Sequence, residues 1–168
     1  MMTSLDELYF HQLRDLYDAE LQLTEALPKM AAKATENDLK EAFAEHLAET
    51  QEQVTRLERV FANHGMPASR ERCEAMNGLI QEGEEAVHEQ GDPLVNDAHL
   101  IAQAQRVEHY EIAGYGTVCS FAKVLGFSSD LPELEATLHE EKNADDLLTK
   151  VATGGMFSAG VNKRSVEV

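Results

Sequence analysis

The stretch 101–125, IAQAQRVEHYEIAGYGTVCSFAKVL, decides the fold of this chain. At helical spacing one of its faces is apolar except near the middle, where two carboxylates and a phenol interrupt it. The residues of that face are Ile101, Ala104, Glu108, Glu111, Tyr115, Val118, Ala122 and Leu125. A glutamate is almost never fully buried without a partner, so the pattern predicts that positive charge lies against this helix.

The composition limits the kind of protein that this chain forms. Its 168 residues, 43% of them hydrophobic, fit one domain with a proper core. A net charge of −17 argues against a nucleic-acid or anionic-membrane partner. No run approaches the roughly 20 apolar residues of a membrane span, and residues 1–10 do not resemble a signal peptide. We therefore expect a cytoplasmic protein.

Three other segments share the interrupted apolar face. Ser4 and Glu7 form a capping box, so a first helix should begin near Leu5, with Pro28 bending or ending it late. A second helix should run over residues 38–63, and a last one should follow a cap formed by Asp130 and Glu133. The polar interruptions are Glu20 in the first segment, His46, Glu49 and Gln53 in the second, and Glu141 and Asp145 in the last.

The connection between the second helix and the central stretch is long. Residues 66–92 contain a weaker helical pattern, which predicts a short helix, and Asp92-Pro93 marks the start of the next long helix. Such a crossover lets the second and third long helices run parallel. The sequence thus predicts an all-α four-helix bundle over residues 1–153, with a short fifth helix in the crossover, no strands, and a loose C-terminal tail over residues 154–168.

Carboxylates near the middle of all four stripes form the candidate metal site. Antiparallel packing with short turns would place them at similar depth. A single such glutamate usually reaches the surface, but four helices with the same feature point to a shared site. The candidate ligands are Glu20, Glu49, Glu108, Glu111, Glu141 and Asp145. Their combined charge would be very costly to bury unless it were neutralised, and two metal ions would neutralise it.

The type of ligand favours particular metals. Oxygen-rich coordination suits iron first and manganese next, whereas the two cysteines, Cys73 and Cys119, form no CxxC pair and so no zinc site. His46 and Gln53 could each supply a ligand or a hydrogen bond to one. Tyr115 fits a supporting or packing role better than a ligand role.

Three segments resemble a known family: DLYDAELQLTEALPKMA (15–31), FAEHLAETQEQVTRLE (43–58) and VEHYEIAGYGT (107–117). Together they resemble the YciF-like family of bacterial stress-related proteins, within the ferritin and rubrerythrin superfamily. The resemblance implies a compact ferritin-like bundle, a homodimer, and a di-iron or dimanganese centre. Most of the superfamily has a histidine three residues after the ligand glutamate (Glu-x-x-His). The chain departs from this pattern, because the residue three after Glu49 is Glu52 and the residue three after Glu141 is Ala144.

Two functions remain open from the sequence. In the first, Glu49 and Glu141 bridge two metals, the other four carboxylates cap them, and Gln53 or His46 completes the site, for ferroxidase, peroxidase or catalase-type chemistry under stress. The absence of CxxC pairs means that any electron donor is external. In the second, the protein is a non-enzymatic stress or structural protein, and the metal is only a structural staple. An iron-storage cage is a third candidate, but the resemblance implies a dimer, which argues against a cage.

Overall fold

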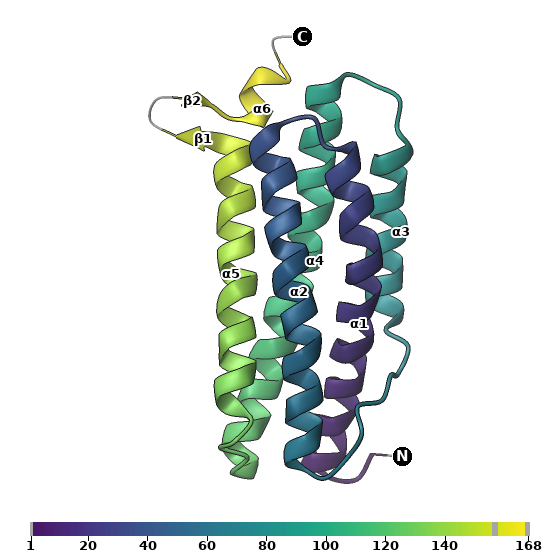
Figure 1. The fold of residues 1–168 in the computed structure, drawn as a ribbon, viewed down its shortest axis with the longest axis vertical. Coiled ribbons are helices and arrows are strands. Elements are labelled where there is room, and N and C mark those ends of the chain that lie inside the picture. Colours follow the sequence, from purple (N-terminus) through teal and green to yellow (C-terminus); the bar gives the residue numbers. More distant parts are fainter. Residues whose placement is uncertain (1, 156–157, 167–168) are drawn as a thin grey trace.

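The computed structural model describes residues 2–155 and 158–166. Four long helices lie side by side along the molecule: α1 (Leu5–Lys33), α2 (Asn37–Asn63), α4 (Pro93–Leu125) and α5 (Leu131–Thr153) (Figure 1). The shorter α3 (Glu74–His88) packs against α1 and α4. The predicted four-helix bundle with a fifth helix in its crossover is confirmed.

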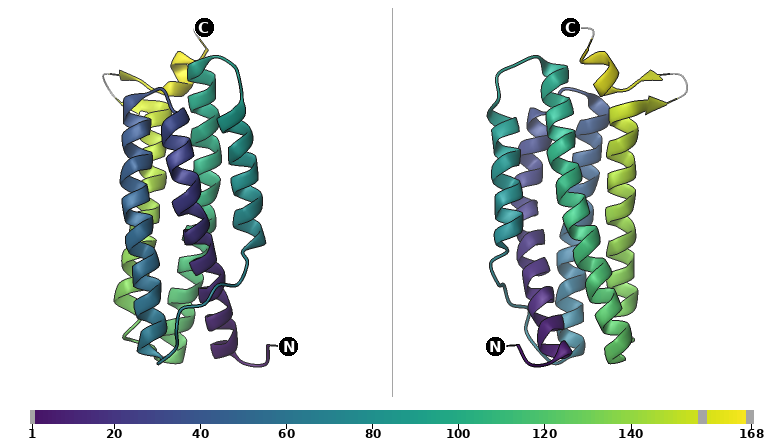
Figure 2. Two further views of the ribbon diagram at one scale, coloured as in Figure 1. Left: turned by 45° about the vertical axis from the view of Figure 1, so that its right-hand side comes forward. Right: turned by 180° about the vertical axis from the view of Figure 1, so that it is seen from behind.

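The two helical hairpins, α1–α2 and α4–α5, are joined by the crossover that carries α3 (Figure 2). Because α3 returns the chain to the end where α2 began, α2 and α4 run in the same direction, as the long connection predicts. The most extensive packing is within each hairpin, between α4 and α5 and between α1 and α2.

Local sequence signals set the helix ends. The Ser4 side chain accepts a hydrogen bond from the Glu7 N–H at 3.3 Å, while the Glu7 carboxylate accepts one from the Thr3 N–H at 2.7 Å. A glycine ends α4: Gly126 at its C-cap has a φ of 74°, a left-handed conformation that favours glycine. Pro28 does not end α1, which continues beyond it to Lys33, so of the two expected effects the ending is wrong and the bend stays a prediction.

The apolar core forms two clusters, one toward each end of the bundle. One includes Leu23, Phe43 and Leu100, and the other includes Leu13 and Phe61. The buried polar residues of the four stripes lie along the helices between these clusters. Both ends of the polar region are therefore sealed by closely packed apolar side chains, which keep water out.

Asp130 does not cap α5 in the predicted way. It stands at the N-cap position, but its side chain makes no capping hydrogen bond. Its fully buried carboxylate instead accepts hydrogen bonds from the Tyr9 hydroxyl at 2.7 Å and the Asn63 amide at 2.9 Å, and lies 2.6 Å from His64 Nε2. Three neighbours, from α1 and from the C-terminal end of α2, thus compete successfully for a carboxylate that could have capped α5.

The C-terminal segment is more ordered than the sequence predicts. β1 (Gly154–Gly155) pairs antiparallel with β2 (Ser158–Ala159), and α6 (Val161–Arg164) packs against α4 and α5. A Cβ on Gly160 would lie 2.2 Å from the Gly154 nitrogen, so the close backbone approach here requires glycine. Residues 156–157 and 167–168 of the predicted loose tail lie outside the described residues.

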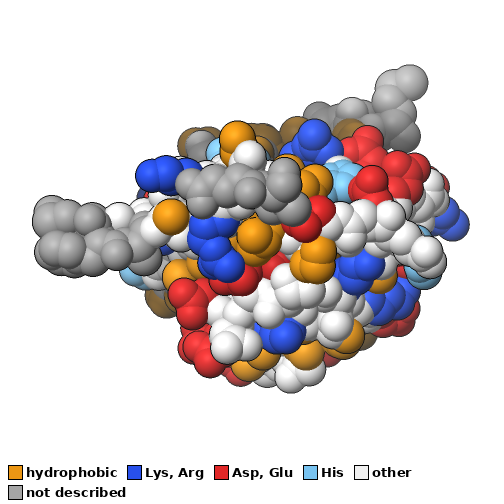
Figure 3. Space-filling model, turned by 90° about the horizontal axis from the view of Figure 1, so that it is seen from above, with side chains coloured by type: hydrophobic (Ala, Val, Ile, Leu, Met, Phe, Trp, Pro, Cys, Tyr) orange, Lys and Arg blue, Asp and Glu red, His pale blue; other side chains and the backbone are white. Residues whose placement is uncertain are grey.

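The surface at the end of the bundle that carries α6 mixes acidic, basic and hydrophobic side chains (Figure 3). Here Arg164 holds the carboxylate of Glu36 through two hydrogen bonds of 2.6 and 2.9 Å, which ties the tail to the start of α2. None of the helices within residues 2–155 and 158–166 is long and apolar enough to cross a membrane.

Candidate metal centre

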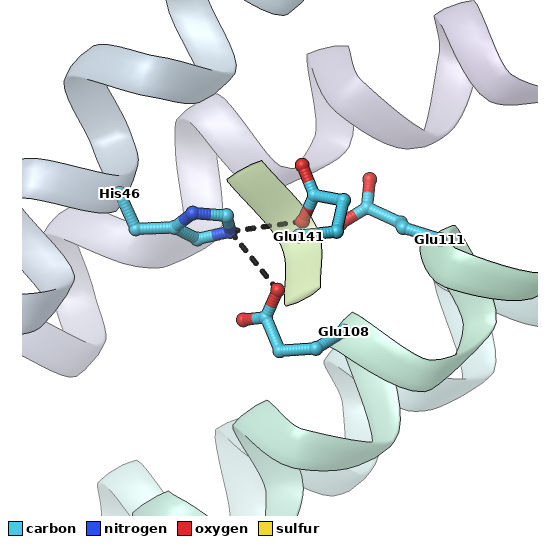
Figure 4. Close-up of side chains that lie close together, drawn as sticks. All are labelled: His46, Glu108, Glu111 and Glu141. Carbon is cyan, nitrogen blue, oxygen red and sulfur yellow. Dashed lines mark ion pairs between the residues drawn. The ribbon is translucent and has the colours of Figure 1, made fainter. Parts of the chain in front are cut away.

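Three helices bring four buried side chains together at the middle of the bundle (Figure 4). α4 contributes Glu108 and Glu111, which are three residues apart and so share a helix face. α2 contributes His46 and α5 contributes Glu141. One ligand atom from each of the four lies within 4.8 Å of all the others. This spacing matches a set of ligands around a common cation.

His46 is the basic residue of the cluster. Its Nε2 lies 3.4 Å from Oε2 of Glu108 and 3.7 Å from Oε2 of Glu141. These contacts appear in Figure 4 as dashed lines, with the Glu141 carboxylate between His46 and Glu111. The distances are those of ion pairs and exceed those of good hydrogen bonds.

Most polar atoms of the cluster lack a hydrogen-bond partner. Within the described residues this holds for both oxygens of Glu111, both ring nitrogens of His46, and one oxygen each of Glu20, Glu108 and Glu141. Native proteins leave very few buried polar atoms unpaired, because each costs about 1–3 kcal/mol. So many unpaired oxygens facing one small region are the expected appearance of a cation-binding site.

Glu20 extends the cluster toward α1. It is fully buried, and the Tyr115 hydroxyl donates a 2.5 Å hydrogen bond to its Oε1, while Oε2 has no partner among the residues that the structure describes. Burial raises the pKa of Glu20 well above its usual value, and the charge of Glu141 raises it further. Glu20 is therefore electrostatically part of the cluster, and Tyr115 has the supporting position that the sequence favours.

Gln53 orients Glu141 by a hydrogen bond. Its amide donates to Oε1 of Glu141 at 2.5 Å and to Oε2 of Glu140 at 3.1 Å. Glu140 is in turn held by both terminal nitrogens of Arg56. A chain of contacts thus runs from the half-buried Arg56 to the centre, and Gln53 acts here as a donor to a candidate ligand.

Two predicted ligands, Glu49 and Asp145, lie outside the group. The Glu49 side chain is 42% exposed, with its Oε2 3.5 Å from Nδ1 of His46 on the side away from Glu108. Asp145 accepts a 3.1 Å hydrogen bond from the Gln105 amide and lies 3.5 Å from Nδ1 of His109. Asp145 therefore faces the outer edge of α4 instead of the centre.

Electrostatics in the cluster favours bound protons whenever no metal is present. Burial raises the pKa of Glu108 and of Glu111 well above 4.5, and the neighbouring carboxylates reinforce this for both residues. Burial opposes a charge on His46, but the carboxylates of Glu108, Glu49 and Glu141 outweigh it and raise its pKa to about 10. Metal ions would take the place of these protons.

The donor set suits a small, hard or borderline cation. Carboxylate oxygens with one imidazole fit iron or manganese, and the unpaired oxygens are already in place. His46 and the three glutamates Glu108, Glu111 and Glu141 can together surround one ion. Glu20, whose pKa the charge of Glu141 helps to raise, offers a further oxygen for a second ion.

Some residues near the centre were not predicted from the sequence. Thr50 is fully buried, and its hydroxyl has no hydrogen-bond partner within the described residues. Arg56 and Glu140 form the outer support of Gln53. Helical spacing offered a signal for Arg56, which follows Gln53 by three residues, whereas Glu140 is recognisable only as the neighbour of Glu141.

The bundle and its buried carboxylate–histidine cluster define a ferritin-like protein with a candidate metal centre. Residues 4–162 match a family described as a domain of unknown function (DUF892), and the chain belongs to this family. It is 40% identical over 163 residues to protein YciF of Escherichia coli K12, covering 96% of this chain and 98% of that protein. The predicted membership in the YciF-like family is thereby confirmed.

Solved structures support the same assignment. The crystal structure of the E. coli stress protein YciF superposes with a TM-score of 0.86 at 42% identity, covering 89% of this chain and 94% of that chain. YcfI from Rhodopseudomonas palustris superposes with a TM-score of 0.87 at 45% identity, covering 89% and 96%. A protein from Xanthomonas campestris, 18% identical with a TM-score of 0.67 and coverage of 97% and 94%, shares the fold.

Proposed function

We propose that this protein binds two metal ions, iron or else manganese, at the centre formed by Glu20, His46, Glu108, Glu111 and Glu141, and that it acts in a stress response. The observation that carries the proposal is the convergence of four ligand atoms within 4.8 Å, together with unpartnered buried oxygens. The similarity to the E. coli stress protein YciF supports the stress role.

Bound iron or manganese would supply one-electron steps for reaction with peroxide or oxygen. The chain's own residues would prepare the site for it. Gln53 and Tyr115 hold Glu141 and Glu20 by hydrogen bonds, and the two apolar clusters close the site toward both ends of the bundle. Glu49, next to His46 at the outer side, would reach a metal only after its side chain turned inward.

Elemental analysis of the purified protein tests metal binding. We expect about two iron or manganese ions per chain, and none in the Glu108→Gln/Glu141→Gln variant, which keeps the shape of both side chains but removes their charge. A wild-type protein that stays folded and refuses both metals would overturn the proposal. Size-exclusion chromatography with light scattering tests the homodimer that the family resemblance implies.

A structural metal is the second candidate function, and one observation favours it. The candidate ligands come from α1, α2, α4 and α5, so bound metal would tie all four long helices together. In that case metal would raise the melting temperature, while peroxide would leave the absorption spectrum of the iron-loaded protein unchanged. A spectral change upon addition of peroxide, lost in the Glu108→Gln/Glu141→Gln variant, would favour the redox function instead.

A further inference from the structure

We propose that a groove between α2 and α5 is the route by which cations reach the buried centre, and that a row of acidic residues along α2 attracts them. This inference rests on the proposed metal binding and adds the path of entry and the residues that control it.

The groove consists of two adjoining hollows. The inner one, of about 170 Å³, is lined on the α2 side by Phe43, His46 and Glu49, on the α5 side by Asn143 and Ala144, and at its deep end by Glu108 of α4. The outer one, of about 520 Å³, lies beneath the C-terminal segment. The two hollows share Ala42, Glu45 and Leu147 in their walls, so they adjoin, and together they make up the proposed passage.

The inner end of this passage consists of atoms that lack partners. The side chain of His46 is 5% exposed and that of Glu108 is 3% exposed. Both ring nitrogens of His46 and Oε2 of Glu108 have no hydrogen-bond partner within the described residues. The hollow thus leads directly to two candidate ligands whose donor atoms are unused.

The walls of the passage carry negative charge at regular spacing. Glu41, Glu45 and Glu49 follow one another at intervals of four residues on α2, with Asp38 one turn earlier, and all of them line one of the two hollows. Like charges at this spacing repel one another, which costs a few tenths of a kcal/mol per pair on an isolated helix. Within the described parts of the chain, Asp38, Glu41 and Glu45 have no ion pair that would offset this repulsion.

The basic residues of the outer hollow do not cancel this charge. Arg164 is engaged by Glu36 at 2.6 Å, and the other basic side chain in the lining is the exposed Lys150. Carboxylates confined to a narrow channel focus the electric field and raise the local concentration of cations. A passage with these walls admits small cations and repels anions.

The rate of metal uptake tests this path. Metal-free full-length protein is mixed with Co²⁺ at low ionic strength, and the cobalt absorption is followed by stopped flow. We expect the Glu41→Gln/Glu45→Gln variant to load about tenfold more slowly than wild type, with the number of bound ions unchanged and the difference greatly reduced at high salt. The matched control is Glu25→Gln/Glu85→Gln, which removes two exposed charges from α1 and α3.

A second variant tests the passage sterically. Ala144→Leu places a larger side chain in the inner hollow and should slow loading at any salt concentration. Wild-type rates in both groove variants, or equal slowing in the Glu25→Gln/Glu85→Gln control, would overturn the proposed route while metal binding itself stood. A wild-type protein that bound no Co²⁺, Fe²⁺ or Mn²⁺ at equilibrium would instead overturn the proposed function, and the route with it.

Discussion

Tyr115 of α4 donates a hydrogen bond of 2.5 Å to the buried carboxylate of Glu20 on α1. The bond joins the two helical hairpins at the level of the candidate metal centre, and both side chains are fully buried. It fixes the orientation of Glu20, so that the oxygen without a hydrogen-bond partner remains available for a cation.

Tyr115→Phe should therefore affect both stability and metal binding. Loss of the hydroxyl leaves a second oxygen of Glu20 without a partner, and we expect the metal-free protein to lose about 1–3 kcal/mol of unfolding free energy. Chemical denaturation measures the loss. Tyr17→Phe is the matched control, because its hydroxyl donates to the exposed Glu58 at 2.9 Å. Equal effects of the two variants would contradict a special role for Tyr115.

The stability of the metal-free protein should fall as the pH rises. Burial raises the pKa of Glu108 and Glu111 above 4.5, so the folded protein retains protons that the unfolded chain has already released. Their contribution to stability is complete below about pH 4.5 and is lost as the pH rises through the raised pKa values. Thermal melts between pH 5 and 8 should show this decline, and added Mn²⁺ should reverse it.

General repulsion in a protein of net charge −17 acts in the same direction. The Glu108→Gln/Glu141→Gln variant separates the two effects, because it keeps most of the repulsion but lacks two of the buried carboxyl groups. The variant should show a weaker dependence on pH. A metal-free wild-type protein that became more stable from pH 5 to pH 8 would contradict the protonated centre.

Gln53→Met should weaken metal binding without unfolding the protein. The substitution keeps the side-chain length but removes the amide that donates to Glu141 and Glu140. Hydrogen bonds that orient metal ligands are typically worth about 10- to 100-fold in affinity, and we expect a loss of that order in a Co²⁺ titration. Gln51→Met, at an exposed position of the same helix, should bind as tightly as wild type.

Asp97 should contribute strongly to stability, although it is not part of the candidate metal centre. Its buried carboxylate on α4 accepts hydrogen bonds from the Thr35 N–H and hydroxyl and from the Glu36 N–H, at 2.9, 2.5 and 2.8 Å. Glu36 stands at the N-cap of α2 and makes no side-chain capping bond, while Asp97 anchors the backbone of the turn that leads into this helix.

Asp97→Ala should lower the unfolding free energy by about 2–4 kcal/mol, because three donors at the α1–α2 turn lose a charged acceptor. Urea denaturation monitored by circular dichroism measures the change. Asp146→Ala, at an exposed position on α5, should stay within about 0.5 kcal/mol of wild type. A loss in Asp97→Ala as small as in this control would show that the turn does not depend on Asp97.

Much of the centre follows from the sequence because helix positions repeat every 3.6 residues. The stripes predicted burial of Glu20, Glu108, Glu111 and Glu141, and the structure buries all four. It also buries His46, Gln53 and Tyr115, three residues for which the sequence did not decide between binding metal and supporting a ligand. Whether these residues bind metal stays a prediction. That they come together in the bundle could be predicted from the stripes and the lengths of the two hairpins alone.

Glu49 and Asp145 show where the pattern alone was insufficient. On an ideal helix Glu49 lies about 60° from His46 and roughly 40° from Gln53, at the same edge of the buried face. Thr50 lies on the other side of His46, and the structure buries Thr50 but leaves Glu49 partly exposed. Asp145 lies about 40° from Glu141 and faces Gln105. Such angles fall within the uncertainty of a stripe about 100° wide.

The sequence by itself determined the four long helices, the crossover helix and their order, because caps, proline and glycine positions, and apolar periodicity act within a few residues of the chain. It also determined which level of the bundle is polar. Only the tertiary structure decided how far each helix turns about its own axis, and hence that His46 faces the cluster while Glu49 and Asp145 face outward. The same holds for Asp97 and Asp130, whose carboxylates accept hydrogen bonds from residues far away along the chain. These outcomes depend on all helices packing at once, and no local pattern along the chain contains that information.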